Sequence, residues 1–190
     1  MRFIISLFFI FCLFLSSSLA QTPLEIMLPV DPNVKMGRLS NGLTYYIRHN
    51  SKPEKIVQLR LVLNVGSVQE EDDQQGLAHF VEHMAFNGLE HFKKNELFSY
   101  MQSIGVRLGD LNANTGHDET IFILPVPTDK KEYVDTAFQV LEDWASGIIF
   151  DPQEIEDERG VVLEEMRQRA LNFGKNYDRE HPGIWQNTGS

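Results

Sequence analysis

The sequence predicts an α+β domain in which helices pack on one face of a largely antiparallel sheet. Two observations support this fold class. Strand patterns come early in the chain and are joined partly by tight turns, as at Asn41-Gly42. Helices and further strands then mix along the rest of the sequence. This order favours one sheet layer with the helices gathered on one side of it.

The first strands are expected before residue 66. The Asn41-Gly42 pair is a strong hairpin signal, and residues 44–48 would form the returning strand. Residues 56–65 alternate apolar with polar side chains, which predicts a half-buried strand. The preceding segment, residues 21–36, contains prolines and is expected to be an extended lead-in.

Helical patterns follow. Residues 76–88 are apolar on more than one side, so they predict a mostly buried helix that ends at Gly88. Asp72 and Asp73 precede this helix and would favour its N-terminus. The other expected elements are a helix over 95–104, strands over 111–115 and 120–126, and a helix over 129–146 capped by Thr128.

The last predicted element is an acidic helix that begins near residue 151. Asp151 suits the N-cap, Pro152 suits the first helical position, and Glu154 would complete a capping box. The helix is expected to continue to Arg167. Most of its acidic side chains, including that of Glu154, are expected to lie in solvent.

The most informative motif is His79-Phe80-Val81-Glu82-His83. Histidines four residues apart in a helix project from one face, so both imidazoles can reach one metal ion. Glu82 lies beside that face, where it could hold a zinc-bound water and take its proton. The order His-x-x-Glu-His is the inverzincin signature. A solvated helix face is the alternative, but the apolar surroundings favour a metal, because buried polar groups need partners.

A catalytic zinc site needs a third protein ligand. The acidic helix is the expected source. Glu158 and Glu165 are two turns apart, so they share one stripe of that helix. Their spacing alone leaves open which of them contacts the metal.

Three segments together resemble the N-terminal domain of the M16 metallopeptidases, the family of pitrilysin and insulin-degrading enzyme. They are Gly76–Phe86, Leu111–Thr115 and Glu158–Met166, and they occur in the family's order within residues 37–169. The gap between His83 and Glu165 is a few residues longer than the family pattern, which an insertion in the intervening loops would explain.

The resemblance implies site roles. The zinc ligands would be His79, His83 and Glu165, with one zinc per chain. Glu82 would be the catalytic base, and Glu158 would support activity without binding the metal. The implied function is a zinc-dependent metalloendopeptidase that cuts extended or unfolded peptides. The alternative is a non-catalytic peptide-binding or assembly subunit of the same family, and the intact motif favours the enzyme.

The segment after Leu111 carries small polar residues, so it is expected to be an edge or bulged strand. It is either a protected sheet edge or a place where a peptide substrate adds as an extra strand. The resemblance favours the second, which makes Asn112, Ala113, Asn114 and Thr115 the candidate substrate-binding residues.

Residues 1–20 match a secretory signal peptide, with Arg2, an apolar run and small residues ending at Ala20. Export to the periplasm or the exterior is therefore expected, and the run is short for a membrane anchor, the alternative. The one cysteine, Cys12, lies in this segment, so the mature chain would form no disulfide. The net charge of −10 disfavours nucleic acid and anionic membranes as partners.

Residues 37–190 are expected to form one zinc-binding domain. In the family, substrate is enclosed between this domain and later ones, which supply an arginine and a tyrosine that hold the substrate carbonyl. The sequence ends at Asn187–Ser190 without a helix cap or a final strand. We therefore expect a C-terminal truncation, with the missing M16 half or a partner subunit completing the site around a peptide substrate.

Overall fold

The computed structural model describes residues 30–180, which divide between Lys52 and Pro53 into two compact units. The expected signal segment, residues 1–20, lies outside the described residues, as do residues 21–29 of the lead-in. None of the helices within residues 30–180 combines the length and the hydropathy that a bilayer crossing requires.

The first unit contains a β-hairpin. Strands β1 (Val34–Arg38) and β2 (Thr44–Arg48) pair antiparallel. In the turn, Gly42 has a φ of 94°, a conformation that glycine adopts without steric cost. The Asn41 side chain accepts a hydrogen bond from the Leu43 N–H at 3.1 Å. The hairpin predicted from the Asn-Gly pair is confirmed.

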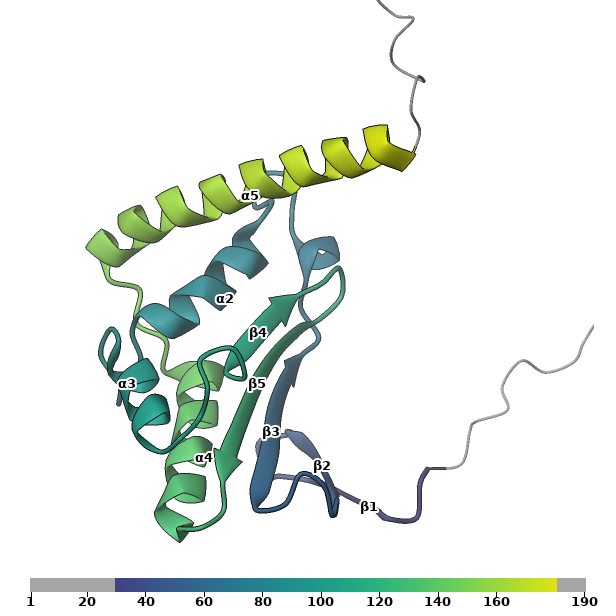
Figure 1. Cartoon of the computed structure of the whole chain (residues 1–190), viewed down its shortest axis with the longest axis vertical. Coiled ribbons are helices and arrows are strands. Elements are labelled where there is room, and N and C mark those ends of the chain that lie inside the picture. The colour runs from purple at the N-terminus through teal and green to yellow at the C-terminus, as the bar shows by residue number, and fades with distance from the viewer. Residues whose placement is uncertain (1–29, 181–190) are drawn as a thin grey trace, which may run out of the picture. The chain divides into compact units, whose positions relative to one another are not determined.

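The second unit is built on a three-stranded antiparallel sheet (Figure 1). Strands β3 (Ile56–Leu63), β5 (Thr120–Pro127) and β4 (Asn112–Thr115) lie in that order, so β4 is an edge strand of this sheet. Every second residue of β5 is buried, as the alternation of side chains along a strand requires. One face of the sheet therefore supplies the core.

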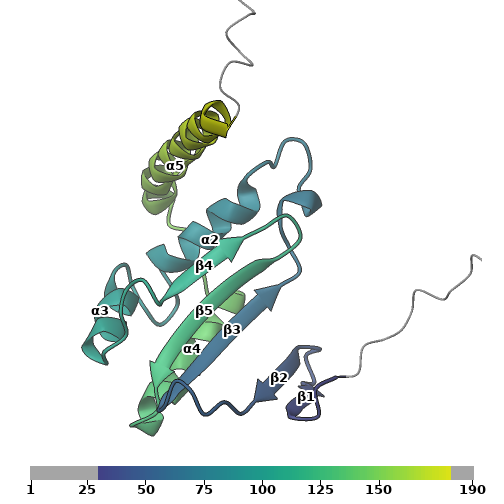
Figure 2. The ribbon, with the colours of Figure 1, turned by 45° about the vertical axis from the view of Figure 1, so that its right-hand side comes forward.

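Helices cover that face of the sheet (Figure 2). Helix α2 (Leu77–Asn87) lies on strands β4 and β5, and helix α4 (Lys131–Ser146) packs on β3 and β5. The long helix α5 (Pro152–Glu180) lies against α2. The predicted class, helices on one face of a largely antiparallel sheet, is confirmed. The helices are the short 3-10 helix η1 (Ser67–Gln69), α2 (Leu77–Asn87), α3 (Glu96–Ser103), α4 (Lys131–Ser146) and α5 (Pro152–Glu180).

The core fixes the position of α2. Trp144 of α4 stacks on Phe122 of β5, with ring centroids 5.0 Å apart, and Phe86 of α2 meets both rings. The Trp144 indole N–H also donates a hydrogen bond to the Ala85 carbonyl at 3.1 Å. Removing a buried aromatic side chain of this kind typically costs about 3–5 kcal/mol. The buried side of α2 is thus held firmly, and its opposite side carries the polar motif.

Helix α4 begins two residues later than the sequence predicts. The Thr128 N–H donates to the Lys55 carbonyl at 2.9 Å, which extends the pairing of β5 with β3 beyond the end of the strand. Thr128 therefore continues the strand direction, and the N-cap is Lys130, whose side chain makes no capping bond. The expected Thr128 cap is wrong because a strand hydrogen bond competes with it.

The start of α5 matches the prediction in part. The Asp151 carboxylate accepts hydrogen bonds from the N–H groups of Gln153 and Glu154, at 2.9 and 3.2 Å, which confirms it as the cap. The Glu154 side chain is half-buried and pairs with Lys94 from the loop before α3. Glu154 therefore ties α5 to the loop before α3 instead of lying in solvent, as the sequence had suggested.

Candidate metal centre

The motif helix α2 is fixed at its N-terminus by a glutamate from the preceding loop. The Glu70 carboxylate accepts hydrogen bonds from the Gly76 and Ala78 N–H groups, at 2.8 and 2.7 Å. Such a bond satisfies donors that a helix end leaves open and is typically worth about 1 kcal/mol. The sequence had pointed to Asp72 and Asp73 instead, and both are exposed. Glu70 lies too far from the helix start for a local capping pattern to reveal it.

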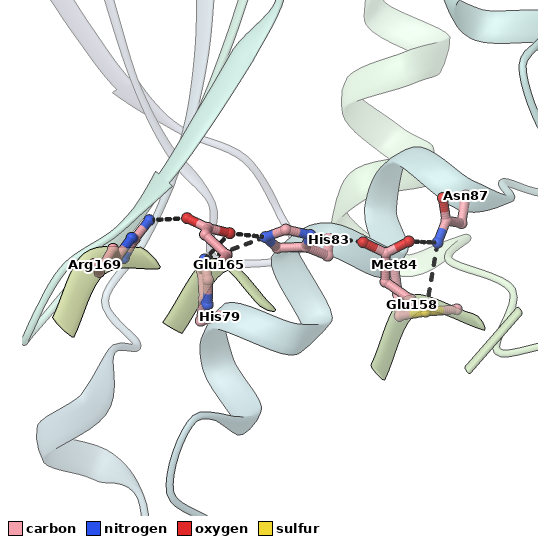
Figure 3. Close-up of polar contacts among 7 residues, drawn as sticks. All are labelled: His79, His83, Met84, Asn87, Glu158, Glu165 and Arg169. Atoms are coloured by element: carbon pink, nitrogen blue, oxygen red, sulfur yellow. Dashed lines mark hydrogen bonds and ion pairs between the residues drawn. The ribbon is translucent and has the colours of Figure 1, made fainter. Parts of the chain in front are cut away.

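The two histidines of α2 point to the same place (Figure 3). The Nε2 atoms of His79 and His83 are 3.2 Å apart, and the rings meet edge to face with centroids 4.6 Å apart. Both side chains are about one-fifth exposed. Two nitrogens so close together within a partly buried site call for a shared proton or a shared cation.

The third group comes from α5. Glu165 Oε2 lies 3.2 Å from His83 Nε2 and 3.8 Å from His79 Nε2. Atoms that bind a tetrahedral zinc at about 2.0–2.1 Å lie about 3.3–3.4 Å from one another. The three measured separations bracket that value, so one point lies about 2 Å from all three atoms. Two imidazole nitrogens and one carboxylate oxygen are also the donors of many catalytic zinc sites.

Glu158 holds the far side of His83. Its Oε1 atom lies 2.7 Å from His83 Nδ1, and its Oε2 atom accepts a hydrogen bond from Asn87 Nδ2 at 2.6 Å (Figure 3). With its proton on Nδ1, His83 turns the lone pair of Nε2 toward His79 and Glu165. Asn87 is not among the site residues that the sequence predicts. The available signal was its position four residues after His83, on the same helix face.

Glu82 faces strand β4 and does not belong to the three-atom cluster. Its Oε2 atom accepts a hydrogen bond from the Thr115 hydroxyl at 2.5 Å. Thr115 and Ala113 share the side of β4 that faces the helices, because their partners on β5 are the buried Thr120 and Phe122. The contact leaves the other Glu82 oxygen available for a further partner.

These groups line one cavity of about 460 Å³, within the usual size range of small-ligand sites. Helices α2 and α5 and strand β4 form its walls, and all four candidate substrate-binding residues, Asn112, Ala113, Asn114 and Thr115, belong to the lining. Asn112 and Asn114 are exposed, whereas Ala113 and Thr115 are half-buried. The structure thus brings every candidate site residue to a single cavity.

The electrostatics of the cavity favour a neutral histidine. Burial lowers the pKa of His79 below its ordinary value, and the neighbouring His83 acts in the same direction, against the opposing effect of Glu165. Metal ions bind the neutral imidazole. A lowered pKa keeps His79 in the form that can donate its lone pair.

Helix α5 meets the rest of its unit mainly through charged groups. Glu154, Glu158 and Glu165 are half-buried, each facing a partner on another element. Within residues 152–169, Val162 is the buried apolar side chain and Ile155 is half-buried. Little apolar surface therefore holds α5 in place, and the charge at the centre matters for its docking.

A second group of possible ligands is Glu90, His91 and Asp143. The buried Asp143 carboxylate accepts hydrogen bonds from the His91 N–H at 3.1 Å and from His91 Nδ1 at 2.8 Å. The hydrogen bond to Asp143 raises the pKa of His91. These contacts already satisfy Asp143 and tie the loop after α2 to α4, so a structural link explains the group.

Comparison with known proteins relates this arrangement to a family. Residues 45–176 match the model of the insulinase family, peptidase family M16. Among curated proteins, the "probable zinc protease PqqL" of Haemophilus influenzae is 41% identical over 161 residues, which cover 84% of this chain. The "zinc protease PQQL-like" of Arabidopsis thaliana is 43% identical over 143 residues, 75% of this chain.

A solved structure is also similar to this chain. The first half of the periplasmic protease PqqL from Escherichia coli matches with a TM-score of 0.71 and 39% identity, over 74% of this chain and 30% of that chain. The present chain spans only a small part of its relatives, 17% of the Haemophilus protein and 15% of the Arabidopsis protein.

Proposed function

Since this chain belongs to the insulinase family, peptidase family M16, we propose that it carries the zinc-binding half of a metalloendopeptidase active site. His79, His83 and Glu165 would hold one zinc ion, and Glu82 would be the catalytic base. The observation that carries the proposal is the meeting of three ligand atoms, from α2 and α5, at separations of 3.2, 3.2 and 3.8 Å. The relatives are named as a probable zinc protease and a zinc protease, and these names support the choice of metal.

The chemistry follows from the placement of the side chains. Zinc, when bound, acidifies a water molecule and polarises the peptide carbonyl. Glu82 would accept the proton of the attacking water and later pass it to the leaving amine, as a general base and then acid. The Thr115 hydroxyl would hold one Glu82 oxygen so that the other faces the water. Glu158 would keep His83 in the tautomer that donates through Nε2.

The substrate would be an extended peptide. Strand β4 is an edge of its sheet and borders the cavity, so its free backbone groups could pair with a peptide segment. Asn112, Ala113, Asn114 and Thr115 would then line the path of that segment. Because main-chain hydrogen bonds carry most of such binding, sequence preference at this edge would be broad.

The location proposed is outside the cytoplasm. Residues 1–20 have the pattern of a signal peptide, and the Escherichia coli relative is described as a periplasmic protease. We further propose that the second M16 half, or a partner subunit, provides the opposite wall of the substrate site, since the relatives are several times longer than this chain.

Peptide cleavage tests this proposal. Residues 21–190, loaded with zinc, should cleave short unstructured peptides barely or not at all, because amide hydrolysis also needs the substrate held in register and its developing charge stabilised. Joined to the remaining M16 domains, the chain should cleave the same peptides in a reaction that a zinc chelator stops and added zinc restores. Cleavage that persists in the chelator would contradict the proposal. Peptide binding without cleavage in the joined protein would favour the assembly-subunit alternative.

A further inference from the structure

Arg169 lies one helical turn after Glu165 on α5 and lines the same cavity. Its guanidinium Nη2 forms an ion pair with Glu165 Oε1 (Figure 3). Arg169 is not among the site residues that the sequence predicts. On this helix face it contacts Glu165, whose other oxygen faces the two imidazoles.

The Glu165 carboxylate is divided between two sets of partners. Oε1 contacts Arg169, whereas Oε2 points to the Nε2 atoms of His83 and His79, at 3.2 and 3.8 Å. The terminal torsion of a glutamate is broad, so an unrestrained carboxylate can turn both oxygens toward a cation. A guanidinium on one oxygen removes that freedom.

We propose that Arg169 is a positioning residue that makes Glu165 bind the metal through Oε2 alone. This inference rests on the metal site proposed above. With one oxygen occupied by Arg169, Glu165 takes up a single place around the metal, which leaves room for the water molecule that Glu82 must reach. Partners that orient a metal ligand commonly change metal affinity by about 10- to 100-fold when removed.

The other ion pairs of α5 provide the contrast. Arg167 pairs with Glu164 at 3.4 Å, and both side chains are exposed. Neither lines the cavity. Arg167 and Arg169 thus differ in the burial of the glutamate that they contact and in their distance from the centre, while they share charge, size and helix. Arg167 is therefore a matched control.

Two effects of Arg169 on metal affinity have opposite signs. Its positive charge repels a cation, so removing it would strengthen binding if charge alone mattered. Its contact with Glu165 orients the ligand, so removing it would weaken binding if positioning matters more. The sign of the change in zinc affinity distinguishes the two.

The test measures zinc affinity by competition with a chromophoric chelator in four forms of the purified chain: wild type, Arg169→Met, Arg169→Lys and Arg167→Met. We expect about 10-fold weaker binding for Arg169→Met, a smaller loss for Arg169→Lys, which keeps a donor, and no change for Arg167→Met. The melting temperatures of the metal-free Arg169→Met and Arg167→Met proteins should agree, because both changes remove an exposed arginine from the same helix.

A spectroscopic readout reports on the ligand itself. With cobalt in place of zinc, Arg169→Met should weaken the visible absorption bands, since a carboxylate that binds through both oxygens raises the coordination number. Zinc affinity that is equal or tighter in Arg169→Met, with unchanged cobalt bands, would overturn the positioning role and leave the metal site intact. Failure of the wild-type chain to bind zinc would overturn the site and this role together.

Discussion

In the chain joined to the remaining M16 domains, Glu82→Gln is expected to reduce peptide cleavage by about 10²–10⁴-fold while zinc affinity stays close to that of the wild type. The glutamine oxygen can still accept the hydrogen bond that Thr115 donates to Glu82, so the side chain should keep its place. An amide cannot take the proton of the attacking water at neutral pH, so the step that needs a base is lost. The measurement is kcat/KM for a short peptide, with zinc content determined on the same samples.

Glu164→Gln is the control for this substitution. Glu164 is exposed on α5 and contacts Arg167 and Gln168, so the same chemical change there should alter neither quantity. If Glu82→Gln lost zinc as readily as a change at His83, the division between base and ligand would be wrong.

Loss of a ligand is expected to remove the metal. His83→Ala and Glu165→Gln should each weaken zinc binding by more than about 100-fold, the upper limit for a residue that only orients a ligand. Glu158→Gln should fall between these variants and the wild type, at about 10-fold, because Glu158 touches His83 through the nitrogen that faces away from the centre. Zinc affinity by chelator competition ranks the four proteins.

Loss of zinc, by chelation or by substitution of a ligand, is expected to loosen the packing of α5 on α2. This helix meets its unit through three half-buried glutamates and little apolar surface. Zinc between α2 and α5 should therefore slow amide hydrogen exchange over residues 152–169, and chelation should speed it. The effect of zinc should vanish in Glu165→Gln and persist in Glu164→Gln. Exchange in α5 that ignores zinc in the wild type would show that the helix does not depend on a metal.

Local sequence signals predicted the elements that depend on few residues. The Asn41-Gly42 turn and the Asp151 cap rest on hydrogen bonds within a few positions, and the structure confirms both. The strand from Ile56 is confirmed too: its own alternation of side chains predicted it, although its partner β5 lies far along the chain. The predicted start of α4, with Thr128 as its cap, was wrong for a physical reason. A hydrogen bond to Lys55, more than 70 residues away, holds Thr128 in strand geometry, and no local pattern contains that partner.

The candidate site likewise has one part that local sequence predicts and another that depends on how distant segments pack. The spacing of His79 and His83 within one helix is local, so it could be predicted from the sequence. The meeting of Glu165 with these histidines depends on how α5 packs on α2, and only the family resemblance pointed to it. The supporting contacts made by Glu70, Asn87 and Arg169 depend on where loops and helix ends lie in space. Their residue types are common on surfaces, so the sequence carries no distinguishing signal for them.

A crystal structure of the zinc-loaded chain, with anomalous data collected at the zinc absorption edge, tests the central claim most directly. We expect one strong anomalous peak, about 2.0–2.2 Å from His79 Nε2, His83 Nε2 and Glu165 Oε2, with Glu82 close by but not bound to the metal. A peak between Glu90, His91 and Asp143 in its place, or no peak on α2, would contradict it.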